Sequence, residues 1–377
     1  MRIGFDGKRA VQNFTGLGNY SRYVADILCH FYPENDYVLY APKKRENKRM
    51  NLLTGQYRQL TLAYPATSFW KKLSSLWRVW GITSQLEKEG IELFHGLSNE
   101  LPLNIHKSRI KSIVTIHDLI FLRYPQYYQS IDRKIYTYKF RKACENADKI
   151  IAISECTKRD IIRYFNIPDD KIEVVYQGCD VSFTHPVTEE KKEEVRKKYQ
   201  LPDHYILNVG SIEERKNILA AVQALPMLPQ HIHIVIVGRR TGYTEKVEQF
   251  IKDNGLGERV HIISNVPFND LPAFYQSAEI FVYPSRFEGF GIPIIEALYS
   301  GIPVVAATGS CLEEAGGPDS IYVNADDITG LDDAFKQIYS NSDKRKNMVE
   351  KGREFAKRFS EKQQSEEIIN IYKKLIR

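Results

Sequence analysis

The stretch EIFVYPSRFEGFGIPIIEALYSGIPVVAAT, residues 279–308, predicts two short apolar strands with one helix between them. The strands are expected at 279–285 and 302–308, and the helix follows a glycine turn that begins at Glu288. Pro293 stands where the first helical residue would be, a position that tolerates proline because its missing N–H has no intrahelical partner. A strand, a helix and a strand in this order predict two parallel strands joined across one face of a sheet.

The same alternation runs through the whole chain and predicts an α/β fold. In the first half the expected strands are 2–6, 37–41, 91–96, 112–118, 149–154 and 172–178. Helical spacing marks 18–31, 76–90 and about 131–147. In the second half the expected strands are 205–211, 231–238, 260–264, 279–285 and 302–308. This alternation is typical of parallel sheets that carry helices on both faces.

A polar and highly charged segment, 184–204, separates the two series of strands and indicates a domain boundary. We therefore expect a doubly wound, Rossmann-like domain over 1–182, a linker over 183–204 and a second such domain over 205–358. Parallel sheets of this type bind ligands at the carboxyl ends of their strands. With two domains, the expected site is the cleft between them.

The composition is that of a soluble globular protein in a reducing compartment. No run of about 18 apolar residues predicts a membrane span, and the opening MRIGFDGKRA lacks the apolar segment of a signal peptide. The five cysteines form no C-x-x-C pair, so we interpret them as reduced thiols rather than disulfide or zinc ligands. We expect a cytoplasmic protein.

Charge is distributed unevenly along the chain. Residues 1–180 hold 28 Lys and Arg against 19 Asp and Glu, whereas the remainder holds 25 against 28. A basic first half suggests an anionic partner there, either a phosphorylated acceptor or an acidic lipid surface. Scattered surface lysines are the alternative interpretation.

The glycine turn carries two carboxylates that point to a specific ligand chemistry. Glu288 lies on the turn and Glu296 lies one turn into the following helix. Carboxylates accept hydrogen bonds from hydroxyl groups, and the N–H groups at the start of a helix favour a phosphate. A phosphate between two hydroxyl-rich rings describes a nucleotide sugar, with Glu288 on the sugar and Glu296 on the ribose. A capped helix with an acidic first turn is the structural alternative.

Residues 283–305 resemble the signature of the retaining GT-B glycosyltransferases of family 4, E-G-F-G-x-P-x-x-E-A, which they match without a gap. The resemblance implies that Gly289, Phe290 and Gly291 line the donor site beside the two glutamates. It also covers SCLEEAGG, 310–317, where Glu314 matches a glutamate of the family's next loop.

The segment VGSIEERKN, 209–217, contains the counterpart of the family's basic pair. By resemblance, Arg215 and Lys216 hold the donor diphosphate, and two cations there would neutralise charge on the leaving phosphates. Many members carry an arginine directly after the glycine, whereas this chain has Ser211, so that phosphate contact is either lost or supplied elsewhere.

Three further features of the first half match the family. Gly16 and Gly18 belong to TGLGNY, which resembles the glycine-rich loop that faces the donor phosphates. His117 ends a strand where the family places a histidine near the transferred sugar, and Asp118 is its expected orienting partner. His95 ends another strand and is a weaker candidate for lining the cleft.

The segment SFWKKLSSLWRVW, 68–80, combines three tryptophans with three basic residues. We favour a helix packed on the N-terminal sheet with Trp77 and Trp80 inward. A helix lying on an anionic membrane is the open alternative. The resemblance also implies that the C-terminal helix, within 359–377, crosses back to the N-terminal domain.

The resemblance covers almost the whole chain and implies a retaining hexosyltransferase for surface-polysaccharide assembly. It would move a hexose from a nucleoside-diphosphate sugar to a hydroxyl of a glycan or glycolipid. A nucleotide-sugar epimerase and a non-catalytic sugar-nucleotide-binding subunit are the alternatives. UDP and GDP stay open as the donor base, although the form R-K-N is similar to mannosyltransferase-like members.

Neither a metal nor another cofactor is expected, because the sequence has no D-x-D motif and no cluster with metal-ligand spacing. Nucleic acid is not an expected partner. We do expect a peripheral contact of the basic N-terminal domain with the inner face of an anionic membrane.

Overall fold

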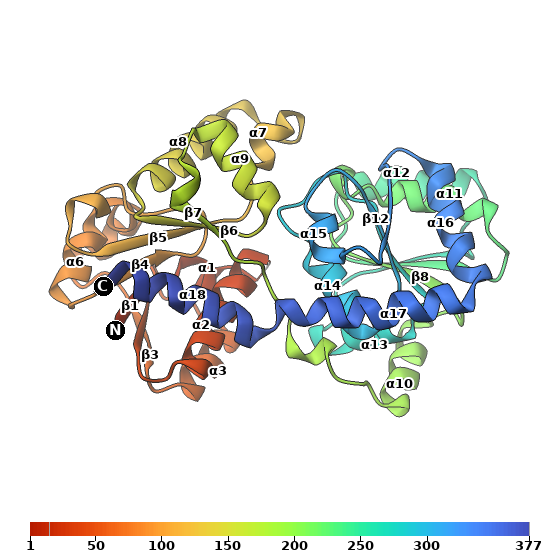
Figure 1. The fold of residues 1–377 in the computed structure, drawn as a ribbon, viewed down its shortest axis with the longest axis horizontal. Coiled ribbons are helices and arrows are strands. Elements are labelled where there is room, and N and C mark those ends of the chain that lie inside the picture. Colours follow the sequence, from red (N-terminus) through yellow and green to blue (C-terminus); the bar gives the residue numbers. More distant parts are fainter. Residues whose placement is uncertain (15, 377) are drawn as a thin grey trace. The chain divides into compact units, whose positions relative to one another are not determined.

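The structure is a computed structural model that describes residues 1–14 and 16–376, and it consists of two compact units (Figure 1). Unit 1 comprises Met1–Tyr176 together with Glu361–Arg377, and unit 2 comprises Gln177–Ser360. Each unit is an α/β layer structure built on one parallel sheet. The predicted fold class, two doubly wound Rossmann-like domains, is therefore confirmed.

Unit 1 contains a seven-stranded sheet in the order β3-β2-β1-β4-β5-β6-β7, with all neighbours parallel. Its strands are β1 (Arg2–Asp6), β2 (Asp36–Tyr40), β3 (Leu60–Ala63), β4 (Leu93–Gly96), β5 (Lys111–Ile116), β6 (Lys149–Ala152) and β7 (Ile172–Val174). The order reverses beside β1, which pairs with β2 on one side and β4 on the other. Crevices for ligands form at the carboxyl ends of strands next to such a reversal.

Unit 2 contains a six-stranded parallel sheet in the order β10-β9-β8-β11-β12-β13. Its strands are β8 (Tyr205–Val209), β9 (His233–Val237), β10 (Val260–Ile263), β11 (Ile280–Tyr283), β12 (Val304–Ala307) and β13 (Ile321–Val323). The order reverses between β8 and β11. The loop after β11, which contains Glu288, therefore starts at the switch point.

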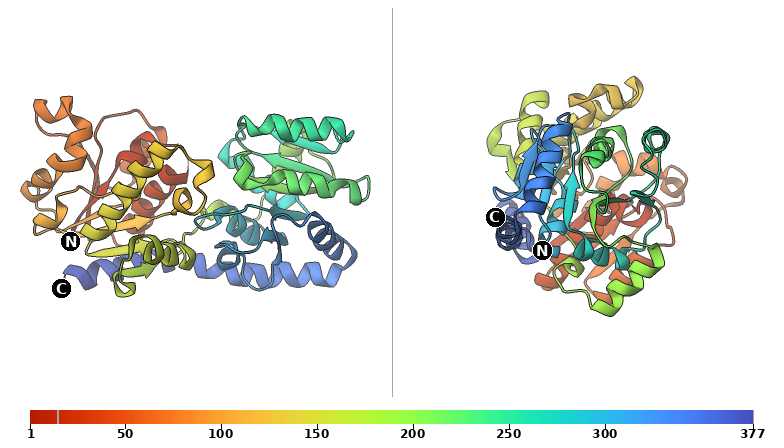
Figure 2. Two further views of the ribbon diagram at one scale, coloured as in Figure 1. Left: turned by 90° about the horizontal axis from the view of Figure 1, so that it is seen from above. Right: turned by 90° about the vertical axis from the view of Figure 1, so that its right-hand side faces the viewer.

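Helices cover both faces of each sheet (Figure 2). Unit 1 has α1 (Lys8–Gln12), α2 (Gly16–Phe31), α3 (Lys48–Gln56), α4 (Ser68–Lys72), α5 (Ser74–Leu76), a π-helix (Trp77–Gly81), α6 (Ile82–Lys88), α7 (Ile120–Arg123), α8 (Ser130–Asn146), α9 (Glu155–Phe165) and α18 (Glu361–Ile376). Unit 2 has α10 (Glu189–Tyr199), α11 (Ile218–Ala224), α12 (Tyr243–Asp253), α13 (Leu271–Ser277), α14 (Ile292–Ser300), α15 (Leu312–Gly316), α16 (Ile328–Ser340) and α17 (Ser342–Ala356). In the described residues no helix is both long and apolar enough to span a bilayer.

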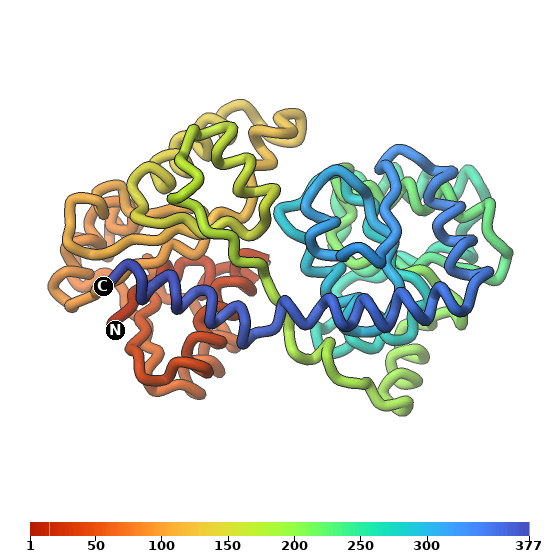
Figure 3. The backbone as a smooth tube through the Cα atoms, in the orientation of Figure 1, coloured from red at the N-terminus to blue at the C-terminus, as the bar shows by residue number. Residues whose placement is uncertain are grey.

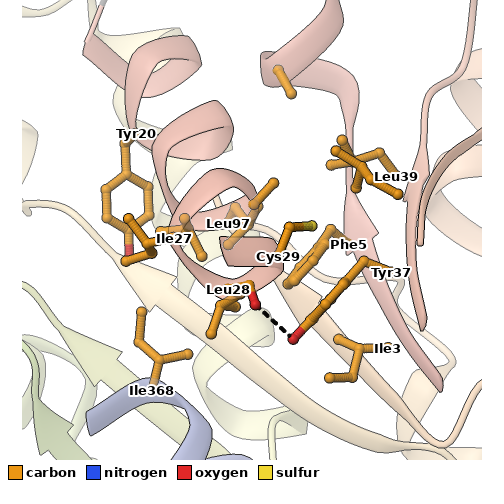
Figure 4. Close-up of a cluster of buried hydrophobic side chains, with 14 of the residues drawn as sticks. Ile3, Phe5, Tyr20, Ile27, Leu28, Cys29, Tyr37, Leu39, Leu97 and Ile368 are labelled. Carbon is orange, nitrogen blue, oxygen red and sulfur yellow. Dashed lines mark hydrogen bonds between the residues drawn. The ribbon is translucent and has the colours of Figure 1, made fainter. Parts of the chain in front are cut away.

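The core of unit 1 joins the first strands to the last helix of the chain (Figure 4). The backbone trace shows this helix beside the first segments of the chain (Figure 3). Phe5 of β1, Leu28 of α2 and Tyr37 of β2 pack in one buried cluster, to which α18 contributes Ile368 and Tyr372. Helices α2 and α18 contact each other directly. The final helix is therefore part of the hydrophobic core of unit 1.

The expected strands all occur, and two further strands, β3 and β13, were not predicted. Both β3 and β13 lie at the edge of a sheet, and their residues are mostly half-buried or exposed. An edge strand that buries little apolar surface lacks the continuous hydrophobic run by which the central strands were predicted.

The expectation that Trp77 and Trp80 both point inward is half wrong. Trp77 is fully buried, but Trp80 is 48% exposed. The segment is not one α-helix: α4 and α5 are short, and Trp77–Gly81 forms a π-helical turn. A turn closed by i→i+5 hydrogen bonds is wider than an α-helical turn, so it rotates Trp80 away from the face that Trp77 occupies.

Gly16 and Gly18 of the predicted glycine-rich loop lie in the first turn of α2, called the glycine-rich turn below, and the close approach at Gly18 allows a direct test of it. A Cβ atom on Gly18 would lie 2.0 Å from the carbonyl oxygen of Asn13, whereas one on Gly16 would have no heavy atom within 4 Å. We expect Gly18→Ala to lower the free energy of unfolding of unit 1 by about 1–3 kcal/mol, because the backbone must move. Gly16→Ala, the matched control, should change it by less than about 1 kcal/mol. Urea unfolding would check both, and equal losses would contradict the steric explanation.

Candidate active site

The loop between β11 and α14 is held in place by contacts with the buried thiol of Cys311. Cys311 Sγ lies 3.0 Å from the carbonyl oxygen of Glu288 and 2.9 Å from that of Phe290, which places it to donate to either. Gly291 has a φ of 135°, in the region that favours glycine, and a Cβ there would crowd Leu312. These contacts fix the turn that connects Glu288 to α14.

Glu288 is held between the two predicted cations. Its carboxylate oxygens lie 2.9 Å from Arg215 Nη1 and 2.6 Å from Lys216 Nζ, and the Ser285 hydroxyl donates to it at 2.7 Å. Burial raises the pKa of Glu288, but the charges of Lys216 and Arg215 and the hydrogen bonds outweigh burial and lower the pKa to about 2. The carboxylate is therefore ionised at neutral pH.

The basic pair is positioned by the turn that follows β8. Asn217 has a left-handed φ of 56°, and its side-chain amide donates to the carbonyl oxygens of Pro284 and Ala325 at 3.2 and 2.7 Å. Asparagine tolerates this conformation better than most residues. The turn is thereby tied to the loop that carries Glu288.

Each cation of the pair also contacts the β11 end of the site. Arg215 donates to the carbonyl oxygen of Phe287, and Lys216 Nζ lies 2.6 Å from the Tyr283 hydroxyl. Both cationic side chains are about 15% exposed. Glu213 also lies 3.7 Å from Arg215 and 3.6 Å from Arg239, so the described ion pairs join three cations to two carboxylates. The excess positive charge can attract an anion such as a diphosphate.

Glu296 lies in a different environment from Glu288. The Tyr275 hydroxyl donates to its carboxylate at 2.6 Å. Burial raises the pKa of Glu296 to about 7, with the hydrogen bond from Tyr275 opposing that rise and the Asp180 charge adding to it. The rings of Tyr275, Phe281 and Tyr283 stack in a row with centroids 5.3 and 5.8 Å apart, so this row joins the Glu296 end to the Lys216 end.

His117 follows β5 in unit 1 and is buried. Its backbone N–H donates to Asn99 Oδ1 at 2.7 Å, and its Nε2 lies 2.9 Å from the Leu97 carbonyl oxygen. That carbonyl oxygen orients this nitrogen, and Asp118, the expected orienting partner, accepts from the backbone N–H of Ile120. Burial lowers the pKa of His117 to about 4, so the ring is neutral at pH 7 and donates through Nε2.

The glycine-rich turn of unit 1 is braced by a buried arginine. Arg22 Nη1 donates to the carbonyl oxygens of Ala10 and Asn13 at 2.7 and 2.9 Å. The same Asn13 oxygen is the one that a side chain at Gly18 would meet. Gly16 is exposed at the start of α2.

The other predicted residues of unit 2 differ in what they contact. The Ser211 hydroxyl donates at 2.6 Å to Glu213, whose carboxylate lies 3.7 Å from Arg215, so Ser211 is linked to the ion cluster. The Phe290 ring is buried against Phe359, with centroids 5.5 Å apart, so only its backbone can face a ligand. In α15 it is Glu313, beside the predicted Glu314, that accepts from the Thr308 hydroxyl and the Gly309 N–H.

The weaker candidate His95 does not line an open surface. It is fully buried, with Nδ1 2.6 Å from the Tyr372 hydroxyl and Nε2 2.8 Å from the Thr115 hydroxyl. Burial lowers its pKa to about 3. The expectation that it could line a cleft was wrong, because a residue at a strand end can still be covered by a helix distant in sequence.

Four residues that position the site were not singled out from the sequence: Asn99, Asn217, Tyr283 and Cys311. Asn99 and Asn217 both have left-handed φ values, 65° and 56°. An asparagine in the loop that follows a predicted strand is a usable signal for this conformation. The contacts of Tyr283 and Cys311 depend on residues from other elements, so no local signal indicates them.

Two family patterns match the two halves of the chain. The pattern of the glycosyl transferases group 1 matches residues 189–355, and that of glycosyltransferase family 4 matches residues 21–183. The chain is 30% identical over 289 residues to the O-antigen chain mannosyltransferase B of Escherichia coli, covering 75% of this chain and 74% of the relative. It is 28% identical to the O-antigen chain mannosyltransferase RfbU of Salmonella typhimurium, covering 60% of each.

Solved structures share the fold at low sequence identity. HepE of Anabaena, in complex with UDP and glucose, superposes with a TM-score of 0.77 at 17% identity, and each chain is covered completely. WaaG, a glycosyltransferase involved in lipopolysaccharide biosynthesis, superposes with a TM-score of 0.70 at 15% identity, covering 98% of this chain and 99% of that one. At these identities the likeness establishes the fold.

The ion cluster predicts a pH-dependent contribution to stability. The folded pKa of Glu288, about 2, lies below its ordinary value of 4.5, so the stabilisation is present above pH 4.5 and is lost as pH falls toward 2. We expect Glu288→Gln to be about 3 kcal/mol less stable than the wild type at pH 7, with a smaller difference at pH 4.

Urea unfolding at several pH values would measure this difference. Glu189→Gln is the control, because its carboxylate pairs with Lys192 on an exposed face of α10. That variant should differ from the wild type by less than about 1 kcal/mol. A Glu288→Gln difference that stays constant from pH 7 to pH 4 would contradict the charge-based explanation.

Proposed function

Because the chain belongs to the glycosyl transferases of group 1, in glycosyltransferase family 4, we propose that it is a retaining hexosyltransferase. It moves a hexose from a nucleoside-diphosphate sugar to a hydroxyl of a glycan or glycolipid acceptor. The observation that carries the proposal is the contact of Arg215 and Lys216 with Glu288 at the switch point of the unit 2 sheet. Cations and a carboxylate side by side suit a ligand that carries phosphates and hydroxyls together.

In the proposed donor complex, Arg215 and Lys216 bind the diphosphate. Glu288 partly neutralises both cations in the ligand-free protein, and its remaining lone pairs accept hydrogen bonds from hydroxyls of the transferred sugar. The start of α14, which follows Gly291, adds backbone N–H groups that favour phosphate oxygens. The donor thus replaces part of an existing charge arrangement rather than ordering a new one, which limits reorganisation during transfer.

Glu296 is assigned to the ribose hydroxyls of the donor. Its pKa of about 7 means that the carboxylate is partly protonated at neutral pH in the free protein. Hydroxyl groups that donate to the ionised form would lower that pKa on binding. Donor binding through Glu296 is therefore coupled to release of a proton.

The reaction proposed is a same-face substitution at the anomeric carbon. The bond between the acceptor oxygen and the anomeric carbon forms as the bond from that carbon to the phosphate oxygen breaks. The acceptor proton passes to the leaving diphosphate, so neither glutamate acts as nucleophile or general acid, unlike the pair of a glycosidase. His117, neutral at pH 7, contributes as a hydrogen-bonding and packing group beside the sugar.

Mannose is the first sugar to test, and the acceptor belongs to surface-polysaccharide assembly. Both reported sequence relatives are O-antigen chain mannosyltransferases. The base stays open, since the fold also occurs in a UDP complex. A thermal-shift panel of GDP-mannose, UDP-glucose and their free diphosphates addresses both questions, because a ligand at 100 times its Kd stabilises by about 2.7 kcal/mol.

Transfer kinetics test the roles of Lys216 and Glu288. We expect Lys216→Met and Glu288→Ala each to lower kcat/KM by about 100-fold or more, as for loss of one transition-state contact. Lys351→Met is the matched control, since Lys351 pairs with Asp319 on the surface of α17. Near-wild-type transfer by either site variant removes its assigned role.

Two further readouts of the same assay test the chemistry. Proton NMR of the product should show the anomeric configuration of the donor, and transfer should persist in EDTA. An inverted product would overturn retention. An epimerised donor formed without any acceptor would indicate an epimerase.

A peripheral membrane contact through unit 1 is also proposed. The side chains of Phe69, Leu73, Leu76 and Trp80 are 61, 39, 44 and 48% exposed on the 68–81 segment, beside the exposed Lys71 and Lys72. Apolar and aromatic side chains next to lysines suit the interface of an anionic bilayer. The location proposed is the cytoplasm, with this segment on the inner face of the membrane.

Vesicle flotation tests the membrane contact. The wild type should float with vesicles of phosphatidylglycerol and phosphatidylcholine and remain behind with phosphatidylcholine alone. Phe69→Ser combined with Trp80→Ser should reduce the bound fraction several-fold, whereas Leu52→Ser, at a 75% exposed residue of α3, should not. Equal binding by the double variant and the wild type would contradict the assignment of this surface.

A further inference from the structure

A chain of buried polar groups joins the last helix to the strand that precedes His117. The Tyr372 hydroxyl of α18 lies 2.6 Å from Nδ1 of His95, at the end of β4. Nε2 of the same ring lies 2.8 Å from the Thr115 hydroxyl of β5. The Thr115 hydroxyl in turn lies 3.3 Å from the Tyr20 hydroxyl of α2. Tyr372 and His95 are 277 residues apart in sequence, so this contact exists only in the folded unit.

The chain ends against the ring of His117. Tyr20 meets His117 edge to face, with ring centroids 4.6 Å apart and planes at 89°. Thr115 also lies two residues before His117, and its carbonyl oxygen accepts from the N–H of Asn99. Asn99 then accepts from the His117 N–H. Both the ring and the backbone of His117 are thus in contact with residues that depend on Thr115.

All of these groups are removed from solvent. Tyr372, His95 and Thr115 have no exposed surface, and Tyr20 is 4% exposed. Burial lowers the pKa of His95 to about 3, so the ring is neutral at physiological pH. A neutral imidazole has one N–H and one lone pair, so one hydroxyl partner must donate and the other must accept.

We propose that Tyr372, His95, Thr115 and Tyr20 form a positioning relay that holds His117 in its working orientation. The proposal rests on the role of His117 given under Proposed function. The relay transfers no proton to the reaction and touches no substrate. The hydroxyls of Tyr372 and Thr115 together hold the ring of His95, His95 in turn holds the Thr115 hydroxyl, and Thr115 holds the hydroxyl and ring of Tyr20. Without the first hydroxyl, the partners reorient, since a buried polar group left unpaired is unfavourable.

The simpler interpretation is that Tyr372 only stabilises the core. Tyr37 provides the comparison, because it lies in the same buried cluster and its hydroxyl donates to the carbonyl oxygen of Leu28 at 3.1 Å (Figure 4). Tyr37→Phe therefore removes a buried hydroxyl of the same chemistry whose described hydrogen bonds go to Asn35, Leu28 and Tyr32 and not to a member of the relay. A purely structural role predicts similar effects of Tyr372→Phe and Tyr37→Phe on transfer.

The first experiment compares Tyr372→Phe with Tyr37→Phe in the full chain. We expect both to lower the Tm, but only Tyr372→Phe to lower kcat, by about 10-fold or more, with donor KM within about two-fold of wild type. Equal kcat in the two variants, after correction for the folded fraction, would overturn the relay.

The second experiment reads the rings directly. In ¹⁵N-labelled protein, Tyr372→Phe should shift the imidazole nitrogen signals of both His95 and His117, whereas Tyr37→Phe should leave those of His117 unchanged. Unchanged His117 signals in Tyr372→Phe would overturn the relay even if activity fell. This readout is independent of transfer, so it also separates the relay from the proposed function. If His117→Ala transfers sugar at the wild-type rate, His117 has no role in transfer. The imidazole signals of His117 in Tyr372→Phe would still test the relay.

A second pair of variants covers the case in which Tyr372→Phe does not fold. Thr115→Val removes the hydroxyl at nearly constant volume, and Thr115→Ser keeps it. Thr115→Val should lower kcat and shift the His117 signals, and Thr115→Ser should retain both near wild type. If Thr115→Val and Thr115→Ser behave alike, the hydroxyl is not the coupling group and the proposal fails.

Discussion

The ion contacts of Glu288 with Arg215 and Lys216 are the interaction on which the candidate site of unit 2 depends. They join the turn after β8 to the loop after β11, the two strands between which the unit 2 sheet reverses its order. The same charges that stabilise the ligand-free loop are those that a diphosphate and a sugar would use. The stability of this loop and its chemistry are therefore properties of one set of side chains.

The two glutamates of the signature differ because their surroundings differ. Glu288 faces cations, which lower its pKa to about 2, whereas Glu296 faces a tyrosine in a buried environment, which leaves its pKa at about 7. The seven-residue gap between them in sequence contains no hint of this difference. Their separate environments suit the separate tasks proposed for them, a permanent charge near the diphosphate and a titrating group at the ribose.

Much of the fold and the centre of the site could be predicted from the sequence, because both rest on local patterns. Central strands are continuous apolar runs, and Glu288, Arg215 and Lys216 stand in turns that directly follow them. Partner choice is not local. The orienting group of His117 is the Leu97 carbonyl, and no pattern around residue 117 indicates it. The edge strand β13 and the exposure of Trp80 were not predicted, because each depends on how much of its surface other elements cover in the folded protein.

The inclusion of α18 in the core of unit 1 has a consequence for how the protein forms. Residues 361–376 complete a cluster that begins at Ile3, so this core cannot close during synthesis until the second sheet has already left the ribosome. Unit 2, which is continuous in sequence, has all of its own residues available earlier. We infer that the incomplete core of unit 1 exposes part of its apolar surface until α18 has been synthesised. Nascent chains are prone to aggregate while such surface is exposed.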